Sequence, residues 1–111
     1  MYKKISKTDA TKILRTVSFD EGFHFTTADG VYTGVTANSL LDFVAKLETV
    51  GENPILFHYP RGDFQKWIET TLGDKELAEK MCFVKGGHSG KDVREQLVWI
   101  IKKRITELKE A

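Results

Sequence analysis

Cysteine, proline, long apolar runs and net charge are all scarce in this sequence. One of the 111 residues is cysteine and two are proline, and 17 basic residues offset 16 acidic ones to leave a net charge of +1. Because Cys82 has no second cysteine, we expect no internal disulfide, a cytoplasmic location, and a buried, unreactive Cys82 side chain. The near-zero net charge gives no overall attraction to nucleic acid, which we therefore do not expect as the partner.

The longest unbroken apolar run, Leu97–Ile101, is far shorter than the roughly 20 residues that cross a bilayer. We therefore expect no membrane contact. Residues 1–7 are lysine-rich and are not followed by an apolar run, so we expect a flexible start and no secretory signal. An apolar content of 41% beside a charged content of 30% is typical of a globular protein, and we expect a single domain, 1–111.

Most of the chain has apolar residues three and four positions apart, which predicts helices. Asp63 and Asp74 are suitable N-cap residues, and Gly73 is a natural helix end between them. The last pattern begins at 89 or 90 and continues to Lys109, which predicts a long C-terminal helix. The expected helices are 8–17, 39–50, 63–72, 74–84 and 90–109.

Residues 23–35 predict a β-hairpin. A three-residue loop with a left-handed glycine pairs Thr27 with Val31 and separates the side chains most cleanly into two faces. One face is rich in phenylalanine and packs on the core. The other face carries His24 and Tyr32.

The run 55–59 alternates as a strand does and ends at Pro60, so we expect a third strand there, with His58 on the same face as His24. Placing this strand beside the first strand of the hairpin predicts the order 2-1-3, fully antiparallel, with a right-handed crossover. The expected fold class is α+β: a two-layer α/β sandwich with a three-stranded antiparallel sheet packed by helices, and a long C-terminal helix.

The segments FHFTTADGVYTGVTANSLLDF and FHYPRGDFQKWIETTLGDKELAEK resemble a small, chiefly archaeal family of domains of unknown function. The resemblance covers roughly residues 10–84, and RGDFQKWI followed by LGDKELA is its most specific part. It implies a natural, complete domain from an archaeal cytoplasm. It assigns no catalytic or binding residue.

The first candidate site is a ligand-binding patch of His24, Tyr32 and His58 on the outer sheet face. Two neutral imidazoles beside a hydroxyl suit a small molecule, or a metal if a carboxylate joins them. No recognised metal-ligand spacing is present, so we predict no metal centre. We favour a solvated sheet face with two unrelated histidines. Pro60 separates His58 from Asp63, so we do not assume that those two form a catalytic pair.

The second candidate is KGGHSGK, residues 85–91, before the last helix. Backbone amides of a glycine-rich loop and a helix N-terminus suit an anion such as phosphate. The contacts would come from Gly86, Gly87, Ser89 and Lys91. The loop differs from a phosphate-binding P-loop because a helical segment, not a buried strand, precedes it. A linker with a capping serine is the simpler interpretation.

The third candidate is Trp99, which falls opposite the apolar stripe of the last helix. An exposed tryptophan indicates an interface with another protein or a second copy, and burial by another segment is the equal alternative. Arg104 falls near the centre of the stripe. It either extends to solvent or, if buried, requires a carboxylate partner, for which Asp20 or Glu21 are candidates.

The leading hypothesis is a small, non-enzymatic binding module that acts through protein–protein contacts, as a homodimer or with another protein. It needs no catalytic residue and no cofactor. The first alternative is a small-molecule or metal-binding protein that uses the His24, Tyr32 and His58 face. The second is a weak nucleic-acid or phosphate binder that uses the 85–91 loop and basic helix faces.

Overall fold

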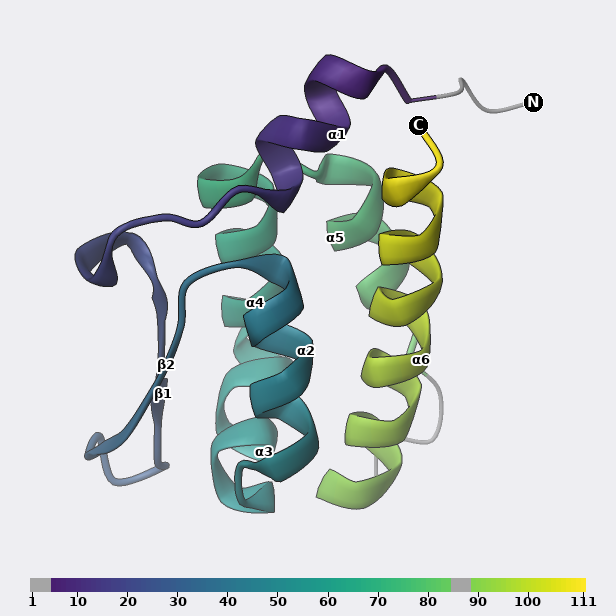
Figure 1. The fold of residues 1–111 in the computed structure, drawn as a ribbon. Coiled ribbons are helices and arrows are strands. Elements are labelled where there is room, and N and C mark those ends of the chain that lie inside the picture. Colours follow the sequence, from purple (N-terminus) through teal and green to yellow (C-terminus); the bar gives the residue numbers. More distant parts are fainter. Residues whose placement is uncertain (1–4, 85–88) are drawn as a thin grey trace.

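The computed structural model of the chain describes residues 5–84 and 89–111. The fold is α+β, with a β-hairpin on one side of α2 and α3 and the long helix α6 on the other (Figure 1). The elements are α1 (Lys7–Leu14), the 3-10 turn η1 (Phe19–Glu21), β1 (Phe23–Thr26), β2 (Tyr32–Ala37), α2 (Leu40–Thr49), α3 (Glu52–Arg61), α4 (Asp63–Trp67), the π-helical turn η2 (Ile68–Leu72), α5 (Lys75–Met81) and α6 (Gly90–Lys109).

The predicted hairpin is confirmed, including its turn. The Thr27 N–H donates to the Val31 carbonyl over 2.9 Å, and Gly30 has a φ of +81°. Further along, a bulge shifts the register so that Phe23 pairs with Ala37. Gly34, with a φ of +87°, lies within this bulge on β2, where a left-handed residue is needed.

The phenylalanine-rich face of the hairpin packs on the helices, as predicted. The ring of Phe23 lies 5.6 Å from Phe43 of α2 and 5.1 Å from Phe64 of α4, centroid to centroid. Phe25 stacks on Phe43 at 5.7 Å. Offset and edge-to-face contacts of this kind add to the stabilisation from burial. This aromatic cluster fixes the hairpin against the helical layer.

The predicted third strand is wrong: residues 55–59 belong to helix α3. A short apolar run does not distinguish a buried strand from a helix, and the flanking residues favour a helix here. Pro54 stands in the first turn, where no intrahelical N–H bond is lost, and Gly62 ends α3 in the left-handed conformation with a φ of +75°. Burial follows a helical period, since Ile55 and His58 are buried while Leu56 is exposed.

The three-stranded sheet of order 2-1-3 and the two-layer sandwich are therefore wrong as well. In the described part of the chain the sheet contains β1 and β2 alone. Side chains of α3 bond to backbone groups that a third strand would otherwise pair. The Ala28 N–H donates to Asn53 Oδ1 over 2.9 Å, and the Thr26 N–H donates to His58 Nε2 over 2.8 Å. An edge covered in this way does not need another strand.

The predicted ends at Gly73 and Asp74 and the bounds 90–109 are confirmed, but α1 ends at Leu14 and α5 at Met81, each three residues before the predicted end. Asp74 caps α5 by accepting from the Leu77 N–H over 3.1 Å, and Gly73 has a φ of +87°. Asp63 is not an N-cap, because its carboxylate accepts hydrogen bonds from side chains instead. Cys82 is exposed, not buried, because α5 ends one residue before it. None of the helices in residues 5–84 and 89–111 is long and apolar enough to span a membrane.

Candidate functional site

An exposed apolar surface lies where α6 passes the end of α5. We call it the Trp99 patch and define it by Phe83, Trp99 and Ile100. The side chain of Trp99 is 64% exposed and that of Phe83 is 75% exposed. Leu97 and Ile101, each two positions from Trp99, are fully buried. Since two positions on a helix turn the side chain to the opposite side, burying the stripe directs Trp99 outward, as the sequence predicts.

Phe83 follows the C-cap residue of α5, Cys82, and its backbone N–H is hydrogen-bonded. The Phe83 N–H donates to the Lys80 carbonyl over 3.2 Å at the exit from the helix. The Tyr59 hydroxyl donates to the Met81 carbonyl over 2.8 Å, which ties α3 to the same point. Burial raises the pKa of Tyr59, so this hydroxyl stays protonated and remains a donor. The exposed phenyl ring therefore stands on a fixed turn.

Shallow hollows flank the Trp99 patch on both sides of the two rings. One, of about 420 Å³, is lined by the patch together with Glu95 and Gln96. The other, of about 240 Å³, is lined by the patch together with Lys80, Lys103, Arg104 and Glu107. The Lys103 ammonium lies 5.2 Å from the centre of the Trp99 ring, a cation–π distance. The surface is thus an apolar centre with a charged rim, which is the usual composition of a protein interface.

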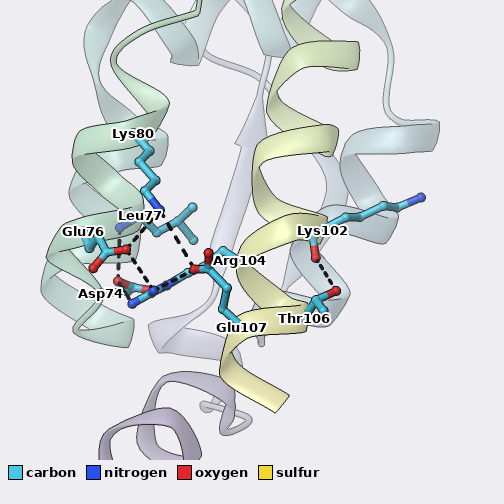
Figure 2. A network of polar contacts seen from close by, with 8 residues as sticks. All are labelled: Asp74, Glu76, Leu77, Lys80, Lys102, Arg104, Thr106 and Glu107. Atoms are coloured by element: carbon cyan, nitrogen blue, oxygen red, sulfur yellow. Dashed lines mark hydrogen bonds and ion pairs between the residues drawn. The ribbon is translucent and has the colours of Figure 1, made fainter. Parts of the chain in front are cut away.

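Arg104 joins the two helices that carry the patch (Figure 2). It is 6% exposed, and its Nε and Nη2 donate to both carboxylate oxygens of Asp74 at 2.8 and 3.0 Å. Its Nη1 donates to Glu76 at 3.1 Å and to Glu107 at 3.0 Å. The predicted need for a carboxylate partner is confirmed, but the partners are not Asp20 or Glu21, the candidates taken from the sequence.

The pKa values of two members of this network, Arg104 and Glu76, shift in the direction that favours their charged forms. Burial alone would lower the pKa of Arg104, but the hydrogen bonds to Asp74 and Glu107 raise it above its ordinary value. The hydrogen bond from Lys80 holds the pKa of Glu76 below its ordinary value. Arg104 thus ties the first turn of α5 to α6, the two helices beside which the Trp99 patch lies.

His24 and Tyr32 come together on the outer face of the hairpin. Nδ1 of His24 and the hydroxyl of Tyr32 both contact Thr36 Oγ1, at 2.8 and 2.5 Å, and the two rings lie 5.8 Å apart. Beside them an open groove of about 470 Å³ is lined by Phe19, Tyr32, Thr36 and Lys46, among others. Thr36 is the member of this cluster that sequence reasoning missed, since the bulge sets its register.

His58 does not join them. It lies on α3 against the inner side of the hairpin, 5% exposed, with its ring 4.8 Å from that of Phe23. Its Nε2 accepts from the Thr26 N–H, so Nδ1 carries the proton and donates to Asp63 Oδ2 over 2.8 Å. One nitrogen therefore binds the hairpin and the other binds Asp63 of α4, so neither is available to a ligand.

The His58–Asp63 pair is a structural link that the sequence reasoning did not expect. Burial tends to raise the pKa of Asp63, but the hydrogen bonds from His58 and Arg61 outweigh it and hold the pKa below its ordinary value. Helical capping at Gly62 turns the chain so that two residues five positions apart meet. Once 55–61 is treated as a helix ended by glycine, this contact becomes a reasonable expectation.

The anion-binding prediction falls partly on Gly86 and Gly87, which lie outside the described residues. Lys91 is exposed, and the Ser89 hydroxyl accepts from the Asp92 N–H over 3.1 Å as a helix cap. Glu52 packs so closely on Gly90 that a Cβ there would lie 2.9 Å from its Oε1. The side chain of Glu52 therefore fills the space beside Gly90 in the first turn of α6.

Among residues 5–84 and 89–111, no three histidine, cysteine, aspartate or glutamate side chains gather closely enough to hold a metal ion. Comparison of the chain with protein-family models, with curated proteins and with solved structures gave no match. The resemblance to the archaeal family therefore stays a prediction, and any function has to be argued from the geometry of the molecule itself.

Proposed function

We propose that the protein is a small, non-enzymatic binding module that acts through protein–protein contacts at the Trp99 patch. The observation that carries this proposal is the exposure of Phe83 and Trp99 side by side on a rigid base. Large exposed aromatic rings add little to the stability of the monomer, because water still surrounds them. When a partner surface covers them, such rings supply most of the binding energy. We place the module in the cytoplasm, since the chain has a single cysteine.

The rigidity of the patch supports the same proposal. Arg104 and Tyr59 tie α5 to α6 and to α3, so the two rings lose little conformational freedom when a partner covers them. Pre-organised side chains of this kind bind more tightly than mobile ones because less entropy is lost on association. The charged rim then selects which surfaces fit.

Affinity capture from an extract of the cells that make the protein tests this proposal. The wild type is compared with Trp99→Ala and with Phe19→Ala, which removes a similarly exposed ring from η1, outside the Trp99 patch. We expect a captured protein that is retained by wild type and Phe19→Ala and lost by Trp99→Ala. When the captured partner is purified and added to the wild-type chain, it should protect Trp99 from collisional fluorescence quenchers.

The second tryptophan provides an internal reference for that measurement. Trp67 is buried, and its Nε1 donates to the Glu21 carbonyl over 2.8 Å, so quenchers reach Trp99 far more readily. When a partner covers the patch, quenchers should no longer reach Trp99, and the part of the fluorescence that they reduce should be lost. If the captured proteins are the same for wild type and Trp99→Ala, or if none protects Trp99, the proposal is wrong.

One observation favours a second candidate function, the binding of a small molecule on the outer hairpin face. His24, Thr36 and Tyr32 form a hydrogen-bonded chain beside the groove that Lys46 lines. Histidine chemical shifts during titration with zinc and with a small-molecule library test this candidate. It requires perturbation of His24, whereas movement of His58 alone would indicate unfolding of the hairpin contact.

A further inference from the structure

We infer that the partner of the Trp99 patch is a second copy of this chain, bound through an antiparallel α6–α6 contact around a two-fold axis at Trp99. This inference rests on the proposed function and names its partner. In a two-fold interface the same surface faces itself, so each charged group must find its complement on that same surface.

The charges on the exposed face of α6 meet this requirement. Glu95 lies four residues before Trp99 and Lys103 lies four residues after it, so both share its face, about 6 Å away in opposite directions along the helix. An antiparallel pair centred on Trp99 places Glu95 of each copy against Lys103 of the other. The interface therefore contains two equivalent Glu95–Lys103 contacts, one on each side of the two-fold axis.

Glu95 and Lys103 are both exposed, and within the described residues Glu95 has no ion-pair partner. Lys103 covers its own Trp99 ring in the monomer. A parallel arrangement would set Glu95 against Glu95 and Lys103 against Lys103, which is repulsive. The charge pattern therefore fits a second copy, and it fits only the antiparallel orientation.

The size of the patch sets the strength of the contact. The exposed parts of the two rings amount to on the order of 300 Å² on each copy, against about 800 Å² for each partner in a standard stable complex. We therefore expect a weak, rapidly exchanging dimer that is populated at high protein concentration and dissociates on dilution.

Sedimentation equilibrium over a concentration series tests the inference. The wild type should rise above its monomer mass of 12.6 kDa as concentration increases. Glu95→Lys and Lys103→Glu each create two like-charge contacts across the axis, and each should weaken association by about tenfold or more. Lys109→Glu makes the same charge change as Lys103→Glu, but at an exposed position ten residues beyond Trp99. This control variant should associate as the wild type does.

An equimolar mixture of Glu95→Lys with Lys103→Glu gives the sharpest result. One copy then carries lysine at both positions and the other carries glutamate at both, so every contact across the axis is attractive. The mixture should recover association that neither variant shows alone, and the double variant should recover it as well.

A wild type that stays monomeric at millimolar concentration overturns the homodimer. So does a Trp99→Ala variant that associates as strongly as the wild type, or a mixture that recovers nothing. A monomeric wild type leaves the proposed function standing if capture still yields a different protein that protects Trp99. If neither self-association nor such a protein is found, both proposals fail.

Discussion

Replacing Arg104 by methionine removes the guanidinium that joins α6 to the first turn of α5 but keeps a long, flexible side chain. Arg104 is 6% exposed and its principal partner, Asp74, is 2% exposed. Removing one member of a buried ion pair costs about 3–5 kcal/mol, because the other charge stays buried without compensation. Asp74 retains one hydrogen bond, from the Leu77 N–H. We therefore expect a loss near the lower end, about 3 kcal/mol.

Urea unfolding at neutral pH, followed by far-ultraviolet circular dichroism, measures this loss. Lys102→Met is the matched control, since Lys102 lies on the same helix and forms an exposed ion pair with Glu48 at 3.4 Å (Figure 2 shows Lys102 and Arg104 together). Exposed pairs contribute about 1 kcal/mol or less, so the control should unfold almost as the wild type does.

Adding Asp74→Asn to Arg104→Met separates the two causes of the loss. Asparagine keeps a side-chain oxygen for the cap of α5 and carries no charge, so the double variant should be more stable than Arg104→Met alone. If Arg104→Met costs less than about 1 kcal/mol, or no more than the lysine control, the reasoning from a buried charge is wrong.

Other predictions concern the hairpin link and the helix ends. His58→Leu leaves the Thr26 N–H without its acceptor, so it should cost about 1–3 kcal/mol in urea unfolding and speed amide exchange in β1. Because its folded pKa is depressed, Asp63 stabilises the fold above its unfolded pKa of about 3.9, and this contribution is lost as the pH falls through the folded value. The acid-induced loss of unfolding free energy should therefore be smaller in Asp63→Asn; an unchanged acid profile would contradict this. Gly73→Ala should cost about 1 kcal/mol or more at its left-handed φ, whereas Gly51→Ala, at a φ of −61°, should be tolerated, as thermal unfolding would show.

Local signals explain the parts of the fold that the sequence predicted. The turn that pairs Thr27 with Val31 and the caps at Asp74 and Ser89 each depend on residues within a few positions of one another. The wrong prediction of a strand at 55–59 also comes from a local pattern. A five-residue apolar run is partly buried in a strand and in a helix alike, so the run by itself does not distinguish them. The deciding information lay in the flanks, where Pro54 suits a first helical turn.

The candidate site was predictable to the extent that it depends on a single helix. The outward direction of Trp99 follows from the period of α6, and so does the inward direction of Arg104. The identity of Asp74 as the partner of Arg104 does not, since the contact joins residues 30 positions apart and depends on how α5 packs on α6.

Phe83 is the half of the patch whose place beside Trp99 the sequence does not give. It lies two positions after the buried Met81, so helical spacing already directs it away from the stripe of α5, but its position beside Trp99 depends on how the end of α5 packs on α6. The hydrogen bond from Tyr59 to the Met81 carbonyl helps to hold this end of the helix, and it comes from α3, where the sequence predicts a strand. Phe83 strengthens the argument for an interface because it adds a second large exposed ring beside Trp99, and a contiguous apolar surface is better evidence of a binding site than a single exposed side chain.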